Sequence, residues 1–325
     1  MAEDSVLSED GVVGEDGVLS EDGVVGEDGV VSEPGRGHGS GRVVIVTGAG
    51  RGLGREHALA FGGQGYRVVV NDVGPSADKV AAEIRGNGGT AVASAGDVSD
   101  WAYARALIDS AVTEFGTLDA LVSNAGINRD RMLVTMSERD WDEVLRVDLK
   151  GHVAPLRHAA AYWRQQARPG RPVSARVVNT SSGAGLMGSV GQGNYAAAKA
   201  GIAALTTVAA AELARYGVTV NAIAPSARTP MTEAVFAERM RVPAAGFDSM
   251  HPGNVSPLVV WLASAESADV TGRMFEVEGG VIAVADGWRH GPAIAKDGRW
   301  DVAEIGGPLR DLLASVPAPA AVYGA

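Results

Sequence analysis

The chain has 325 residues and a hydrophobic content of 46%, enough to bury one large core. It contains no cysteine, which excludes disulfide bonds, thiolate catalysis and cysteine-ligated metal sites. The formal net charge of −11 originates in residues 1–34, which hold eleven acidic residues and no Lys or Arg. Setting those aside leaves 28 acidic and 28 basic residues, so the rest of the chain lacks the basic surface that a nucleic-acid partner would require.

Residues 3–32 form a repeat with a period of six, in the units EDSVLS, EDGVVG, EDGVLS, EDGVVG and EDGVVS. Stacking such units would bring their acidic residues together, so we expect residues 1–41, with the Gly-rich linker, to be a disordered tail. The acidic start does not match a secretory signal, and no apolar run approaches the roughly 20 residues of a membrane helix. A cytoplasmic protein without a metal site is expected.

From residue 42, short apolar runs alternate with helical patterns, as in a parallel sheet whose two faces are both covered by helices. We therefore predict a single-domain Rossmann fold of the α/β class over residues 42–285, with a doubly wound parallel sheet, and a C-terminal extension over 286–325. Another short apolar run, Leu258–Ala263, belongs to the same succession of apolar segments. The predicted strands are Val43–Val46, Val68–Val70, Thr90–Ala95, Leu118–Ser123, Val177–Thr180, Val218–Ile223 and Met274–Val277, and the predicted helices are Arg55–Gln64, Asp78–Arg85, Trp101–Phe115, 138–166 and Tyr195–Tyr216.

A glycine-rich turn, TGAGRGLG, joins the first predicted strand to the first predicted helix. Glycines let the backbone approach a pyrophosphate, and the helix N-terminus supplies N–H groups and positive potential. A turn of this kind alone is weak evidence, since tight turns also need glycine, but its place between strand and helix strengthens it. The candidate cofactor-binding residues here are Gly48, Arg51, Gly52, Leu53 and Gly54.

Asp72 ends the second predicted strand, 18 residues after Gly54. A carboxylate at that place accepts hydrogen bonds from ribose hydroxyls and repels a 2′-phosphate, which predicts NAD rather than NADP as the cofactor. Arg51 is the counter-argument, because an arginine nearby could accept that phosphate. The sequence also offers groups for the adenine and for close passage of the cofactor at the ends of later strands: Asp97, Val98, Asn124, Ala125 and Gly126.

Tyr195 and Lys199 lie four residues apart on a predicted helix and so share a face, and Ser182 lies 13 residues earlier. A free tyrosine has a pKa near ~10, too high for a base at neutral pH, and a neighbouring ammonium favours its phenolate. Such a phenolate removes the proton of an alcohol while hydride leaves the carbon, with the serine hydroxyl holding the substrate oxygen. The three residues are therefore predicted to be catalytic.

The motifs TGAGRGLG, NAG and YAAAK preceded by the serine together resemble the short-chain dehydrogenase/reductase family, over about residues 42–285. The resemblance implies that Tyr195 and Lys199 also contact the cofactor, Lys199 at the nicotinamide ribose. It further implies that Pro225 and Thr229 cover the carboxamide. Where the family commonly has an asparagine serving a proton relay, this chain has Asp148, which is expected to act there although an ionised carboxylate cannot donate.

Closer pieces, VVVNDVG, AGINRDR, TSSGAGLMGSVGQGNYAAAKAG and FEVEGG, resemble the dehydrogenase domain of the peroxisomal multifunctional enzyme type 2 and its actinobacterial relatives. This resemblance implies a 3-hydroxyacyl-CoA or 17β-hydroxysteroid substrate, and a homo-oligomer, either dimer or tetramer. The alternatives are an NADPH-dependent 3-oxoacyl-[acyl-carrier-protein] reductase and a non-catalytic NAD-binding interaction protein. An apolar substrate lid is expected over residues 227–252, and the extension is expected to narrow the substrate mouth or to wrap over a neighbouring subunit.

Overall fold

The computed structural model describes residues 39–168, 173–233, 237–285 and 287–324, and the acidic tail predicted over residues 1–41 lies almost wholly outside them. In the described residues the strands form one eight-stranded sheet in the order β3-β2-β1-β4-β5-β6-β7-β8, where β8 is antiparallel to β7 and the other pairs are parallel. The strands are β1 Val43–Val46, β2 Arg67–Asp72, β3 Thr90–Ala95, β4 Ala120–Ser123, β5 Ala175–Thr180, β6 Val218–Ser226, β7 Met274–Glu278 and β8 Val281–Ala285.

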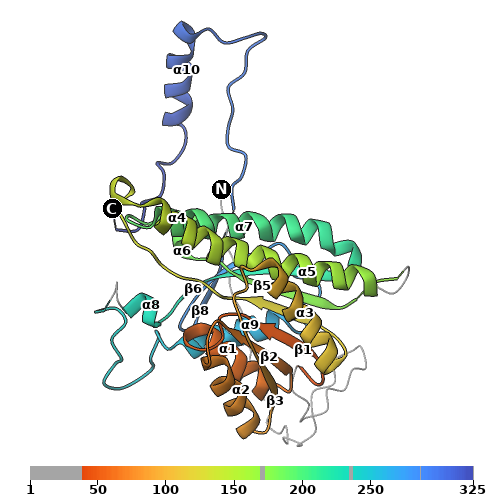
Figure 1. The fold of residues 1–325 in the computed structure, drawn as a ribbon. Coiled ribbons are helices and arrows are strands. Elements are labelled where there is room, and N and C mark those ends of the chain that lie inside the picture. The colour runs from red at the N-terminus through yellow and green to blue at the C-terminus, as the bar shows by residue number, and fades with distance from the viewer. Residues whose placement is uncertain (1–38, 169–172, 234–236, 286, 325) are drawn as a thin grey trace, which may run out of the picture. The chain divides into compact units, whose positions relative to one another are not determined.

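Helices cover both faces of this sheet, because its strands are apolar on both sides (Figure 1). Helices α1, α2 and α9 pack on one face with Phe61 and Ile84, and α3, α5 and α7 pack on the other with Leu107 and Trp163. The helix bounds are α1 Gly52–Gly63, α2 Ser76–Gly86, α3 Trp101–Phe115, α4 Glu138–Val144, α5 Gly151–Gln166, α6 Gly183–Met187, α7 Gly193–Leu213, α8 Pro230–Glu233, α9 Ser256–Leu262 and α10 Val302–Ala314. The predicted doubly wound Rossmann fold is confirmed.

The strand order reverses between β1 and β4, and chain connections leave these two strands toward opposite faces of the sheet. Ligands of such sheets bind at the carboxyl ends of the strands beside this reversal. The end of β1 and the end of β4 therefore mark the expected position of the cofactor, and the site residues lie around them.

The long helix predicted over 138–166 contains an unpredicted π-helical segment, Leu145–Lys150, between α4 and α5. Such a segment inserts extra backbone into the helical ladder, which hydrophobic periodicity alone does not reveal, and it is frequent at functional sites. Asp148 lies within it. The widened turn thus presents the carboxylate from inside the helix layer.

One helix among the described residues, Gly193–Tyr216, is long and apolar enough to cross a membrane by length and composition alone, contrary to the sequence expectation. It comprises α7 and a short 3₁₀ turn, and it packs its buried residues Ile202, Ala209 and Leu213 on the sheet. Core helices of globular proteins commonly pass this test. Helix α6 packs closely on α7, since a Cβ atom at Gly185 of α6 would lie 2.6 Å from the backbone of Lys199.

Candidate active site

The glycine-rich turn has two glycines in the left-handed region, Gly48 with φ +60° and Gly52 with φ +54°. A Cβ atom at Gly48 would lie 2.7 Å from the Cα atom of Ala125, and one at Gly54 would lie 2.3 Å from the carbonyl oxygen of Gly48. No side chain fits at either position without moving backbone. The turn therefore keeps an open, backbone-lined cradle at the N-terminus of α1, which suits the pyrophosphate of a dinucleotide.

Asp72, at the end of β2, lies directly against this turn. Its Oδ2 atom accepts a hydrogen bond of 2.8 Å from the backbone N–H of Gly50, and its Oδ1 atom accepts one of 2.8 Å from that of Val73. A Cβ atom at Gly50 would lie 2.7 Å from Oδ2, so the carboxylate needs glycine there. The side chain is half-buried, and Arg51 beside it is exposed. The predicted ribose-binding residue is thus next to the predicted phosphate-binding turn.

The turn after β4 is fixed to the turn after β1 by Thr47, which the sequence analysis did not single out. The Thr47 Oγ1 atom accepts hydrogen bonds from the backbone N–H groups of Asn124 and Ala125, at 2.9 and 3.2 Å. The Asn124 side chain donates in return to the carbonyl oxygens of Thr47 and Gly48, at 3.1 and 3.2 Å. Asn124 and Ala125 therefore shape the cradle rather than stand apart from it.

The two residues predicted near the adenine, Asp97 and Val98, follow β3, and Val98 is buried. Asp97 accepts hydrogen bonds from the Ser99 backbone and hydroxyl at 2.9 and 2.6 Å, and pairs with Arg146 at 2.5 Å. Partial burial acts to raise the pKa of Asp97, but these hydrogen bonds outweigh it and hold the pKa below the ordinary value. An ionised carboxylate anchored in this way is available to accept from an adenine amine through its remaining lone pairs.

The three predicted catalytic residues come from two neighbouring elements. Ser182 follows β5 and caps α6, while Tyr195 and Lys199 project from the first two turns of α7. The Lys199 Nζ atom lies 5.4 Å from the centre of the Tyr195 ring and donates a hydrogen bond of 3.0 Å to the carbonyl oxygen of Thr180. The Ser182 hydroxyl lies near the Tyr195 phenol and acts to lower its pKa. The structure therefore brings the predicted trio together.

The charges around Tyr195 act in opposite directions. Burial raises the pKa of the phenol above its ordinary value, and Lys199 and the Ser182 hydrogen bond oppose this increase. The carboxylates of Asp148 and Asp130 raise the pKa further, because each disfavours a second negative charge nearby. The phenol is therefore protonated without ligand, and a positive charge brought by an oxidised nicotinamide beside it would favour ionisation.

Asp148 is fully buried next to Lys199. It lies between α4 and α5, which share one helix layer with α7 (Figure 1). Its Oδ1 atom accepts a hydrogen bond of 2.8 Å from the Ile127 N–H, and its Oδ2 atom lies 3.4 Å from Lys199 Nζ. Burial raises the pKa of Asp148, and Lys199 opposes this rise. One turn later, burial lowers the pKa of His152 to about 3, so this ring is neutral beside the pair. Asp148 therefore pairs with the Lys199 ammonium inside the protein.

Replacing Asp148 with Asn should shift the pH profile of alcohol oxidation to lower pH, by about 0.5–1 unit. Asp148 raises the pKa of Tyr195, so removing its charge lowers that pKa and the rising limb of kcat/KM appears earlier. Initial rates between pH 6 and 10 measure the shift. Glu143→Gln, a carboxylate-to-amide change on α4 away from Lys199, is the control, and an unmoved or more alkaline profile for Asp148→Asn would contradict this account.

Pro225 and Thr229 lie at and beyond the end of β6. Pro225 pairs with Val277 of β7, and Thr229 closes over the glycine-rich turn, since a Cβ atom at Gly52 would lie 3.5 Å from its methyl group. Thr229 also bonds Thr232 through its backbone and hydroxyl. Of these two, Thr229 is placed against the predicted cofactor cradle.

The predicted lid over 227–252 is anchored at both ends rather than free along its length. Arg228 pairs with Asp248 and donates to the Met240 carbonyl at 3.1 Å, while Met240 and Met250 are buried. Phe247 is exposed, and Val235 and Phe236, two further apolar residues of the predicted lid, lie outside the described residues. The apolar composition thus serves packing at Met240 and Met250, whereas Phe247 is exposed.

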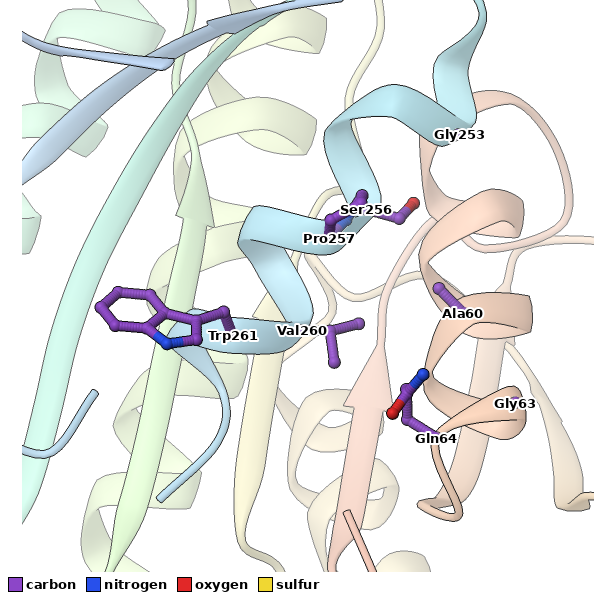
Figure 2. Close-up of a pocket in the computed structure, with 8 residues that line it drawn as sticks. All are labelled: Ala60, Gly63, Gln64, Gly253, Ser256, Pro257, Val260 and Trp261. Atoms are coloured by element: carbon purple, nitrogen blue, oxygen red, sulfur yellow. The ribbon is translucent and has the colours of Figure 1, made fainter. Parts of the chain in front are cut away.

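A separate apolar depression of about 550 Å³ lies between α1 and α9 (Figure 2). It contains none of the predicted catalytic residues, and it borders the C-terminal half of α1, whereas the cofactor cradle borders the N-terminus. The predicted chemistry therefore belongs to the carboxyl ends of the strands. The lining residues are Ala60, Gly63, Gln64, Gly253, Ser256, Pro257, Val260 and Trp261.

The Rossmann sheet, the glycine cradle and the Ser–Tyr–Lys trio together define a nicotinamide-dependent oxidoreductase. The chain belongs to the short-chain dehydrogenase family, whose model, described as short chain dehydrogenase, matches residues 42–240. The family resemblance predicted from the motifs is confirmed.

Two curated relatives and one solved structure are similar to this chain. The hydroxyacyl-CoA dehydrogenase ChsB1 of Mycobacterium tuberculosis is 48% identical over 284 residues, which are 85% of this chain and 89% of that protein. The peroxisomal multifunctional enzyme type 2 of Mus musculus is 41% identical over 74% of this chain but only 32% of its own length. The crystal structure of a short chain dehydrogenase from Mycobacterium avium is 60% identical, with a TM-score of 0.83, and the match covers 89% of this chain and all of that chain.

Proposed function

We propose that the protein oxidises the 3-hydroxyl group of an acyl-CoA thioester to a ketone with NAD, within lipid or sterol degradation. The observation that carries the chemistry is the Ser182–Tyr195–Lys199 trio beside the glycine cradle. The substrate class is supported by the similarity to a protein named hydroxyacyl-CoA dehydrogenase along 85% of this chain. A 17β-hydroxysteroid offers the same secondary alcohol and is the neighbouring candidate.

Each residue has a distinct part in this reaction. Ser182 donates a hydrogen bond to the substrate oxygen, and Tyr195 accepts the hydroxyl proton from it. Lys199 stabilises the phenolate while Asp148 and the Thr180 carbonyl hold the ammonium. Bound NAD would take up the hydride released from the carbon. In the reverse direction Tyr195 returns the proton to the ketone.

The cofactor is held, in this proposal, by residues at the carboxyl ends of the strands and in the turns that follow them. The cradle from Gly48 to Gly54 receives the pyrophosphate and Asp72 receives the adenosine ribose. Thr229 closes over the cradle from β6. The full proposed set also includes Arg51, Gly52, Leu53, Asp97, Val98, Asn124, Ala125, Gly126, Tyr195, Lys199 and Pro225.

Replacing Asp72 with Ser should lower the preference for NAD over NADP by about 100-fold, through weaker NAD use and stronger NADP use. The serine hydroxyl can still bond a ribose hydroxyl, but the negative charge of Asp72 that repels a 2′-phosphate is gone. The ratio of kcat/KM for the two cofactors measures the change. Asp78→Ser on α2 removes the same charge nearby and should leave the ratio unaltered; equal ratios for Asp72→Ser and the wild type would contradict the assignment.

The function itself is tested by initial rates of nicotinamide reduction over (3R)- and (3S)-hydroxyacyl-CoAs of several chain lengths and over 17β-hydroxysteroids. Turnover of a hydroxyacyl-CoA with NAD at least ten times more efficient than any steroid is the expected result. Activity confined to NADPH and an acyl-carrier-protein thioester would instead support the reductase alternative. We further propose a cytoplasmic homo-oligomer.

A further inference from the structure

The C-terminal end of the chain returns to the loop that follows α6, beside the catalytic serine (Figure 1). The Val190 N–H donates a hydrogen bond of 2.9 Å to the carbonyl oxygen of Tyr323, and the Tyr323 N–H donates one of 3.2 Å to that of Gly188. These bonds form a parallel bridge between Ser189 and Tyr323. Terminal residues usually fray unless they are tied down, so this pairing calls for an explanation.

The ring of Tyr323 lies on Gly183, the residue directly after Ser182. A Cβ atom at Gly183 would lie 3.0 Å from the Tyr323 Oη atom and 3.1 Å from its Cε2 atom. Val322 packs in the same way over Gly188, where a Cβ atom would lie 3.3 Å from its Cγ1 atom. The absence of side chains at these two glycines is what admits the C-terminal residues so close to the serine.

The Tyr323 hydroxyl makes no hydrogen bond within the described part of the chain, and the side chain is 48% exposed. A phenol that packs its ring and leaves its hydroxyl unpaired beside a catalytic serine has a donor available for a ligand. Two apolar residues near it, Met187 at the end of α6 and Val190 in the loop that follows, are also partly exposed.

The opposite side of this loop is apolar too. The Gly191 carbonyl accepts a hydrogen bond of 2.7 Å from the Arg131 N–H, which brings residues 131–134 alongside. Met132, Leu133 and Val134 there are exposed, at 54%, 79% and 92%. Large apolar side chains on both sides of one loop form a rim that suits an acyl chain.

We propose that Val322 and Tyr323 form one wall of the substrate site, and that the Tyr323 hydroxyl donates a hydrogen bond to the thioester carbonyl of the substrate. In a 3-hydroxyacyl-CoA that carbonyl lies two carbons from the reacting carbon, close to the oxygen that Ser182 binds. Tyr323 is a substrate-positioning residue, since the proton and hydride transfers are made by other groups. This proposal rests on the proposed function.

The test compares Tyr323→Phe with Tyr216→Phe, a hydroxyl deletion in the 3₁₀ turn that follows the C-terminal end of α7. In Tyr323→Phe, kcat/KM for the best 3-hydroxyacyl-CoA should fall about 10-fold, mainly through KM, as expected for one lost hydrogen bond. The dissociation constant of NAD should be unchanged, because the residue contacts only the substrate side. Tyr216→Phe should match the wild type in kcat/KM, in KM and in the dissociation constant of NAD.

A second variant, a chain ending at Pro319, removes the whole wall and should raise KM further than Tyr323→Phe, with NAD binding retained. If the wild type oxidises hydroxyacyl-CoAs and both variants keep its kcat/KM, the wall does not exist. A loss in the truncated chain with none in Tyr323→Phe would overturn the assigned hydrogen bond. Failure of the wild type to oxidise any hydroxyacyl-CoA would overturn the proposed function instead.

Discussion

Tyr195→Phe should reduce kcat for alcohol oxidation about 1,000-fold, because it removes the group that we propose accepts the hydroxyl proton. The ring and its contact with Lys199 remain, so the dissociation constant of NAD should stay within a factor of about two. Stopped-flow or steady-state rates, together with NAD titration by fluorescence or calorimetry, give the two quantities. The separation between lost turnover and retained binding is the signature of proton transfer.

The control for this substitution is Tyr162→Phe on α5, which removes a hydroxyl from the helix layer outside the trio. It should leave kcat unchanged. Unaltered turnover in Tyr195→Phe would remove the catalytic assignment of this residue, whereas NAD binding without any turnover in the wild type would favour the alternative of a non-catalytic NAD-binding protein.

Gly54→Ala should weaken NAD binding by about 100-fold and destabilise the fold by about 1–3 kcal/mol. The new Cβ atom would lie 2.3 Å from the Gly48 carbonyl oxygen and 2.5 Å from the Asn124 side-chain nitrogen. Backbone at the cradle must move to make room, and the N–H groups then no longer converge on the pyrophosphate. Calorimetric titration with NAD and thermal denaturation without it report the two effects separately.

Gly63→Ala supplies a matched control at the other end of α1, where an added Cβ atom meets no atom within 4 Å. Alanine favours a helix over glycine, so the stability of this variant should rise by a few tenths to about 1 kcal/mol. NAD binding should be unchanged. Wild-type NAD affinity in Gly54→Ala would mean that the cradle does not hold the cofactor.

The elements that could be predicted from the sequence are those whose pattern is local. The runs at Val43–Val46 and Val68–Val70 are β-branched and buried on both faces, and they form β1 and part of β2. The run at Leu258–Ala263 is equally apolar but mostly forms α9, since composition alone does not separate a short buried helix from a strand.

The parts that the sequence analysis missed depend on tertiary contacts. The antiparallel strand β8 is defined by its hydrogen bonds to β7, and the π-helical segment at Asp148 by a local change of the helical hydrogen-bond pattern, and hydrophobic periodicity encodes neither. Helix α10, by contrast, carries a local sequence signal for its start, the capping box of Asp301 and Glu304.

Within the site, the residues predicted to carry out chemistry follow a spacing that the sequence reveals, whereas the residues that hold them in place do not. Tyr195, Lys199 and Ser182 belong to a recognisable spacing, and the structure assembles them. Thr47 and Arg146 act through partners 77 and 49 residues away, Asn124 and Asp97, so no short motif marks them. A threonine that directly precedes a glycine-rich turn is the one signal that could have pointed to Thr47.

Lys199 is hydrogen-bonded to the residues at the end of β5 through both its side chain and its backbone. Its Nζ atom bonds the Thr180 carbonyl, and its own carbonyl accepts a hydrogen bond of 2.8 Å from the Ser181 hydroxyl. The next residue along is Ser182, so the strand that presents the serine also clamps the lysine. Heating that loosens α7 would therefore displace Tyr195, Lys199 and Ser182 together. Loss of activity on heating should then follow a single exponential, without a partly active intermediate.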